Sequence, residues 1–153
     1  MGGIYCSYTI FDPKDEVHPN DVLNGIFYIH SDEKKDKVLK NVEIQLYERF
    51  EEYGYNDFEE KHMWEEREVH LKDYPIAQNI AIRPGEEIEV PFAIRLVGTW
   101  QPKTDKAHRN WSLELQFCQK TGMFTTRGAD EDGATCVLPV RGSSKAPSIH
   151  QMR

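Results

Sequence analysis

A chain of 153 residues, 39% of them hydrophobic, is long enough to bury a self-sufficient core without disulfides or a structural metal. Its formal net charge of −7 argues against nucleic acid or an anionic membrane as the main target, since both select basic surfaces, and it favours basic or dispersed-charge partners. No run approaches the ~18 apolar residues that span a bilayer and no secretory leader is evident, so we expect a soluble cytoplasmic protein.

Alternation of apolar and polar side chains predicts about eight β-strands and no convincing helix. Turn residues, mainly Pro, Gly, Asn and Asp, separate them. In chain order, the predicted strands cover residues 4–11, 22–30, 42–46, about 64–71, 80–82, 88–96, 111–117 and 136–140.

The clearest pattern lies at residues 88–96, which alternate strictly over nine positions. One face carries Ile88, Val90, Phe92, Ile94 and Leu96, and the other carries Glu89, Pro91, Ala93 and Arg95. This period of two is typical of a strand with one buried and one solvated face. Because proline cannot donate to a ladder, Pro91 predicts an edge position or a local break in pairing.

Two further positions carry backbone information. Gly25 lies inside the predicted strand 22–30, where it indicates a bulge or the close approach of another backbone. Tyr74-Pro75 is expected to turn the chain after the strand at about 64–71, and Pro84-Gly85 to turn it before residue 88.

Residues 48–68 hold nine acidic and three basic residues, a net charge of −6, so nearly all of the net charge lies there. Their apolar positions keep no helical stripe, and we interpret the stretch as a long hairpin loop. Exposed aromatic side chains are costly unless they pack beneath their own loop or meet a partner, and both readings stay open. The candidate interaction residues are Tyr53, Tyr55, Phe58, Trp64, Glu51, Glu52, Glu59 and Glu60.

Catalytic and metal-binding motifs are absent from the sequence. The six histidines have no HxH or HExxH spacing, there is no CxxC, and no phosphate-binding glycine motif follows a strand, so we expect no enzyme, no cofactor and no metal. The acids of 48–68 and of 130–132 could coordinate calcium, but solvated loop charges are favoured. The basic loops 34–37 and 103–109 could contact phosphate groups, with a solvated face again favoured.

The three cysteines, Cys6, Cys118 and Cys136, are odd in number and widely spaced. This favours reduced, mostly buried thiols, although a disulfide between two of them stays open.

These elements together predict an all-β fold, an immunoglobulin-like two-sheet antiparallel β-sandwich. We expect one domain over residues 1–140 and a polar C-terminal tail over residues 141–153.

Two stretches, in order and well separated, resemble signatures of the arrestin-fold superfamily. Residues 17–29 resemble V-x-P-G-D-x-V-x-G-x-V-x-I through Pro19, Asp21 and Gly25, with Asn20 where glycine is usual. Residues 82–94 resemble its second signature, a glycine turn followed by a Pro-Phe pair, through Pro84, Gly85, Pro91 and Phe92. The chain is nearest to the sporulation-control (Spo-zero-M-like) and vacuolar-sorting retromer branches.

The resemblance implies a non-enzymatic adaptor or scaffold in trafficking or regulatory assembly. Such families usually carry two of these domains in tandem, whereas this chain has length for one, so we expect a homodimer or pairing with a second arrestin-like domain. Any membrane role would be indirect. The alternative hypothesis is a small-ligand-binding or metal-binding sandwich, with or without enzymatic activity, that uses loop acids and histidines.

Overall fold

The computed structural model describes residues 3–13, 16–96, 100, 102–103, 105–128 and 137–140. Within these residues all regular structure is β-strand. The strands are β1 (Ile4–Phe11), β2 (Val22–Ser31), β3 (Lys37–Asn56), β4 (Lys61–Ile82), β5 (Glu87–Arg95), β6 (His108–Lys120), β7 (Thr126–Arg127) and β8 (Val137–Val140).

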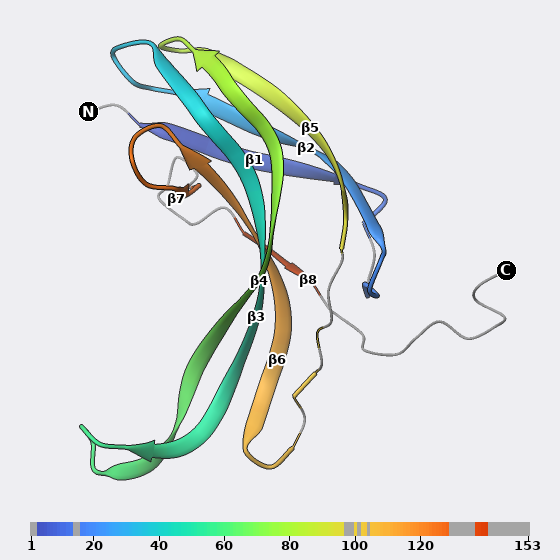
Figure 1. Ribbon diagram of the computed structural model, residues 1–153, viewed down its shortest axis with the longest axis vertical. Helices are drawn as coiled ribbons and strands as arrows, with labels where there is room; N and C mark the ends of the chain where they lie inside the picture. Colours follow the sequence, from blue (N-terminus) through green and yellow to red (C-terminus); the bar gives the residue numbers. More distant parts are fainter. Residues whose placement is uncertain are drawn as a thin grey trace, which may run out of the picture.

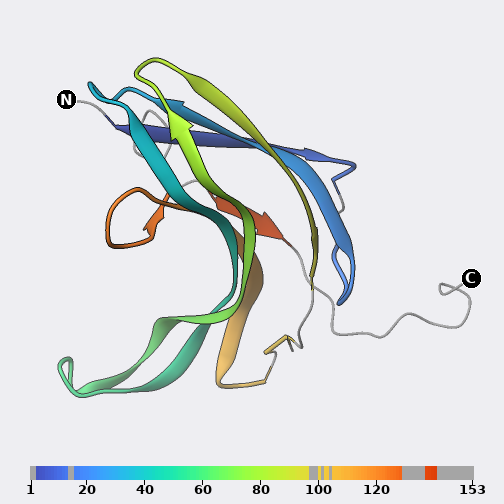
Figure 2. The ribbon, with the colours of Figure 1, turned by 45° about the horizontal axis from the view of Figure 1, so that its top comes forward.

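The strands form two antiparallel sheets (Figure 1). The smaller sheet has the order β1-β2-β5, and the larger has the order β4-β3-β6-β7, with β8 also pairing with β6. Figure 2 shows the small sheet facing one end of the large one, whose β3–β4 hairpin continues beyond it. The predicted two-sheet antiparallel β-sandwich is confirmed.

The small sheet follows the sequence pattern closely. Along β5, Val90, Phe92 and Ile94 are buried, and the residues between them are exposed. The strand lies at the edge of its sheet, which agrees with the edge position that Pro91 predicts. Gly25 pairs with Ile10 and Phe92 in regular register, so the close approach of another chain segment, and not a bulge, explains this glycine.

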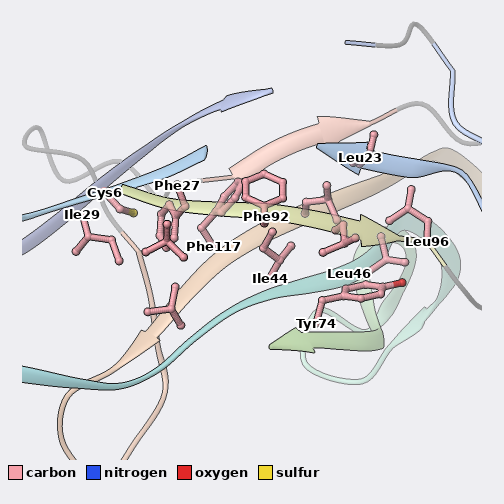
Figure 3. Close-up of a cluster of buried hydrophobic side chains, with 14 of the residues drawn as sticks. Cys6, Leu23, Phe27, Ile29, Ile44, Leu46, Tyr74, Phe92, Leu96 and Phe117 are labelled. Carbon is pink, nitrogen blue, oxygen red and sulfur yellow. The ribbon is translucent and has the colours of Figure 1, made fainter. Parts of the chain in front are cut away.

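The core lies between the two sheets, and Phe117 of β6 is near its centre (Figure 3). Its ring contacts one ring from each strand of the small sheet: Tyr8 at 4.8 Å, Phe27 at 4.8 Å and Phe92 at 5.9 Å between centroids. Apolar side chains of β3, namely Leu39, Val42, Ile44 and Leu46, complete the opposite wall. Burial of these side chains, at roughly 2 kcal/mol each, supplies most of the free energy that holds the two sheets together.

The interpretation of residues 48–68 as a loop is wrong. β3 and β4 run through this stretch as paired strands, from Glu48 opposite Val69 to Asn56 opposite Lys61. Only residues 57–60 form the turn. The predicted turn at Tyr74-Pro75 is also wrong, because β4 continues through it to Ile82. Pro75 is tolerated there since β4 is an edge strand and the register shifts between Val42 and Glu43 opposite it.

One strand of the structure has no counterpart in the sequence predictions, and some of the predictions fall on residues that the structure does not describe. The two-residue strand β7 was not predicted. The proposed tail 141–153, Cys136 and the acids at 130–132 lie outside the described residues. In the part of the chain that the structure describes, no helix is long and apolar enough to cross a membrane.

Candidate functional site

Residues 48–68 form what we call the distal arm, the half of the β3–β4 hairpin that extends past the small sheet (Figure 1). The main hydrophobic cluster reaches Leu46 on β3 and Leu71 on β4, and among residues 47–70 only Tyr47, Glu48 and Phe50 are buried. Twenty residues of β3 at about 3.3 Å each make this strand roughly 65 Å long before twist and bending. The arm is therefore held by cross-strand side-chain pairs and backbone ladders, and not by burial in the sandwich.

The tip of the arm is a turn fixed by Asn56. The Glu59 backbone N–H donates to the Asn56 side-chain oxygen at 2.9 Å, while the Asn56 amide donates to Glu65 at 2.6 Å. Glu60 adopts a left-handed backbone, with φ of 52°. These bonds define the tip and present the intervening Phe58, whose side chain is 97% exposed.

One face of the arm carries a row of rings. Tyr53 lies against Trp64 with centroids 5.2 Å apart, and His62 lies between Tyr53 and Tyr55, at 5.8 Å and 5.3 Å. At its inner end the row finishes with the Arg109 guanidinium, 4.2 Å from the centre of the Trp64 ring. Tyr53 and Tyr55 remain about half exposed. Of the four candidate aromatic residues, three thus share a face and Phe58 occupies the tip.

The four candidate acids do not form one surface. Glu51 lies on the face of the ring row and binds Arg109 at 3.0 Å and the Asn110 amide, and these two bonds, in that order, lower the pKa of its carboxyl. Glu52 points to the other face by strand alternation. Glu59 and Glu60 are exposed at the tip.

Arginines link the inner part of the arm to its neighbouring strands. Arg49 binds Glu114 of β6 at 2.9 Å and Glu68 of β4 at 3.4 Å, and the hydrogen bond with Glu114 raises the pKa of the guanidinium. Arg127 binds Glu68 at 2.7 Å, which ties β7 to the same network. These contacts were not foreseen, because they join residues that are distant in sequence, 65 positions apart for Arg49 and Glu114 and 59 for Arg127 and Glu68.

The second face of the arm carries a histidine held between two carboxylates. The two ring nitrogens of His108 lie 2.7 Å from Asp105 and 3.0 Å from Glu52. Asp105 first, and then Glu52, raises the pKa of His108, and His108 in turn lowers the pKa of Asp105. Arg67 approaches Glu52 at 3.7 Å, and Lys103 lies over the neighbouring Phe50 ring at 5.2 Å. The cluster joins the start of β6 to the arm.

Replacing His108 with glutamine is expected to lower stability more at about pH 5.5 than at about pH 8.5. The folded-state pKa lies above the ordinary 6.5, so the protonated ring contributes stability that is fully present below 6.5 and is lost as the pH rises through the raised value. Urea unfolding of both proteins at the two pH values measures the difference. An equal loss at both would show that the charge of His108 contributes nothing.

We compared the positions of the acidic and basic side chains with what metal binding and phosphate binding would require. Among the described residues, no three His, Cys, Asp or Glu side chains come together as a group that could hold a metal ion. Of the two basic loops, the first has Lys34 and Lys35 between β2 and β3 and Lys37 at the start of β3, at the opposite end of that strand from the arm. Lys103 is engaged with Phe50 in the other.

Sequence reasoning missed a hollow on the small sheet. It measures about 580 Å³ and is lined by residues of β1, β2 and β5, with Asp12 at its side. The strand residues are Phe11, Asn24, Gly25, Pro91, Phe92 and Ala93. No local pattern marks it, because its lining residues come from three strands that are separate in sequence.

The two arrestin-type signatures meet in space, since β2 and β5 pair from Val22 opposite Arg95 to His30 opposite Glu87. The turn around Asn20 closes one end: the Asn20 N–H donates to the Leu96 carbonyl at 2.6 Å, and the Leu96 N–H to the Asp21 carbonyl at 2.8 Å. Gly85, with φ of 78°, closes the other by donating to the Ser31 carbonyl at 2.8 Å. Pro19 and Pro84 precede these turn residues. Asn20 has φ of 74°, a conformation that asparagine tolerates, so its replacement of glycine keeps the turn.

No protein-family model matches the chain, and no curated protein matches it in sequence. Solved structures do match. Spo0M, the sporulation control protein from Bacillus subtilis, superposes with a TM-score of 0.57 at 15% identity over 86% of this chain, which spans 50% of Spo0M. The CARDB domain of PF1109 from Pyrococcus furiosus gives a TM-score of 0.39 at 8% identity, over 93% of this chain and 89% of that domain, too low to carry an argument. The likeness to Spo0M, together with the two paired signatures, shows that this chain has an arrestin-like fold of the Spo0M kind.

Proposed function

We propose that the protein is a non-enzymatic adaptor or scaffold that binds other proteins through the distal arm. The observation that carries this proposal is the position of Phe58, almost fully exposed at the end of a hairpin built outside the core. A large apolar side chain in water contributes nothing to the fold and favours association. The exposed rings of Tyr53 and Tyr55 extend the same surface toward the sandwich.

Rigidity of the arm supports this assignment. Cross-strand arginine–carboxylate pairs and the ring row hold its two strands in one arrangement, so little ordering entropy is lost when a partner binds. Pairing through an exposed sheet edge belongs to the same proposal, since β1 and β5 flank the small sheet and β4 borders the large one. We place the protein in the cytoplasm as part of this proposal.

A photo-crosslinking amino acid at position 58, in the full chain expressed in its native cells, is expected to capture a protein. Position 124 is the matched control, because Phe124 is also a largely exposed phenylalanine but lies between β6 and β7. Gel mobility and mass spectrometry of the adducts measure the outcome, and an adduct of two copies would identify self-association.

Capture at position 124 but not at 58 would refute the arm as the binding element. Capture at neither position would count against the adaptor function itself. For the alternative ligand-binding hypothesis, the structure offers no specific support in the arm: Glu51 and Glu52 are already engaged by Arg109 and His108.

A further inference from the structure

The arm's inner end has its anionic and aromatic groups occupied by the protein's own cations. The Arg109 side chain does both tasks at once, with its Nε 3.0 Å from Glu51 and its guanidinium stacked on Trp64. Arg127 does the same by binding Glu68 while lying 5.5 Å from the centre of the Tyr47 ring. Each site therefore combines one carboxylate, one ring and one arginine from a different strand.

The outer end has the same carboxylates and rings but lacks the cations. Among the described residues, no ion pair involves the four outer carboxylates, and no cation lies over the three outer rings. The basic residues there are Lys61 and His62, and the His62 ring lies between those of Tyr53 and Tyr55. The carboxylates are Asp57, Glu59 and Glu60 at the turn and Glu66 on β4 opposite Glu51, and the rings are Tyr53, Tyr55 and Phe58.

We propose that this outer end binds an extended segment of a partner protein that carries Lys or Arg at alternating positions. The inference rests on the proposed function and specifies the partner. Tyr53 and Tyr55 lie on one face of β3, two residues and about 6.7 Å apart. Alternate side chains of an extended segment repeat at the same spacing, so consecutive cations reach consecutive rings.

The negative charge of the arm favours a basic segment over a neutral or acidic one. The arm's net charge of −6 attracts a cationic segment and repels acidic or phosphorylated ones. Cations over tyrosine faces gain more where carboxylates stand nearby, and the engaged Arg109 shows that this local chemistry accepts a guanidinium. A partner residue at the tip would additionally cover Phe58.

The test uses the full chain and a short fluorescent peptide of alternating arginine and threonine, with fluorescence anisotropy as the readout. We expect saturable binding that weakens as salt rises. Peptides with glutamine or glutamate in place of arginine are expected not to bind. Equal binding of the glutamine peptide would overturn the proposal.

Two sets of variants locate the site. Changing Tyr53 and Tyr55 to serine is expected to weaken binding about tenfold, whereas changing both to phenylalanine keeps it. Both side chains are exposed, so an unchanged melting temperature will show that the fold is retained. Binding that is the same for the serine and phenylalanine pairs would overturn the role of the rings.

The carboxylates have a matched control elsewhere on the molecule. Amide replacement of Asp57, Glu59, Glu60 and Glu66 is expected to weaken binding and to flatten its salt dependence. The same change in charge at exposed Asp32, Asp36, Glu87 and Glu89 is expected to alter affinity less than about twofold. If both sets of substitutions weaken peptide binding equally, the peptide responds only to the net charge of the protein, and the proposal of a local binding site is overturned.

Failure of this inference is distinguishable from failure of the adaptor function. If crosslinking at position 58 captures a protein but the arginine peptide does not bind, the partner is not basic and the adaptor function stands. If the peptide fails to bind and position 58 captures nothing, both proposals are overturned.

Discussion

Replacing Phe117 with alanine is expected to lower the free energy of unfolding by about 3–5 kcal/mol, the usual cost of truncating a buried phenylalanine. The ring is fully buried and touches one aromatic side chain on each strand of the small sheet: Tyr8, Phe27 and Phe92. Its loss therefore opens a cavity at the point where the two sheets meet. Urea unfolding followed by tryptophan fluorescence measures the change.

Phe124 provides the control for this substitution, since the same change at a largely exposed phenylalanine removes the same atoms without opening a cavity. We expect Phe124→Ala to alter stability by less than about 0.5 kcal/mol. A loss below about 1 kcal/mol for Phe117→Ala would mean that the surrounding side chains collapse into the space and that this ring does not join the sheets.

Replacing Gly25 with alanine is expected to cost about 3 kcal/mol, at the upper end of the usual range for added volume in a packed site. A β-carbon at this position would lie well inside van der Waals contact with the Thr9 carbonyl oxygen and 2.8 Å from Cζ of Phe92. The first of these is backbone of the neighbouring strand β1, so relief requires moving a strand and not merely a side chain. Thermal and urea unfolding would both report the loss.

Gly54 is the matched control, because it also lies inside a strand but has no atom within 4 Å of the added carbon. Gly54→Ala should change stability by less than about 0.5 kcal/mol. If the two alanine variants proved equally stable, close strand approach could not be the reason for glycine in the first signature.

The small sheet and the core could be predicted from the sequence because one face of each strand is apolar. β1 begins and ends where the alternation does, and β5 does so to within one residue. The same residues supported the resemblance that the Spo0M comparison confirms at the level of fold. Pro91 predicted either an edge position or a local break in pairing, and the structure has β5 at the edge of its sheet.

The arm could not be predicted in the same way, because charged residues interrupt the apolar and aromatic positions on both of its faces. Along β3, Arg49, Glu51 and Tyr53 alternate with Glu48, Phe50, Glu52 and Gly54, so no hydrophobic period of two is sustained. Pairing there depends on partners distant in sequence, such as Glu114 for Arg49. The pairing of β3 with β6 is also irregular between Arg49 and Glu51, inside the arm.

The candidate residues of the site were located in part. Aromatic and acidic composition singled out the correct segment, and the structure places Tyr53, Tyr55 and Trp64 on one face. Arg109 binds Glu51 and His108 binds Glu52, and the sequence alone places both of these basic residues in a separate loop, 103–109. Only tertiary contacts separate Glu51 and Glu52 from the open acids at the tip.

The projection of the arm also makes the molecule a strong electric dipole. Of the net charge of −7, −6 lies on residues 48–68, which leaves −1 for the remainder of the chain. The excess negative charge thus lies on the arm, outside the core between the two sheets. In the field of a cationic surface the protein would rotate arm-first before any contact forms, so diffusional encounters would begin at Phe58 and its neighbouring carboxylates.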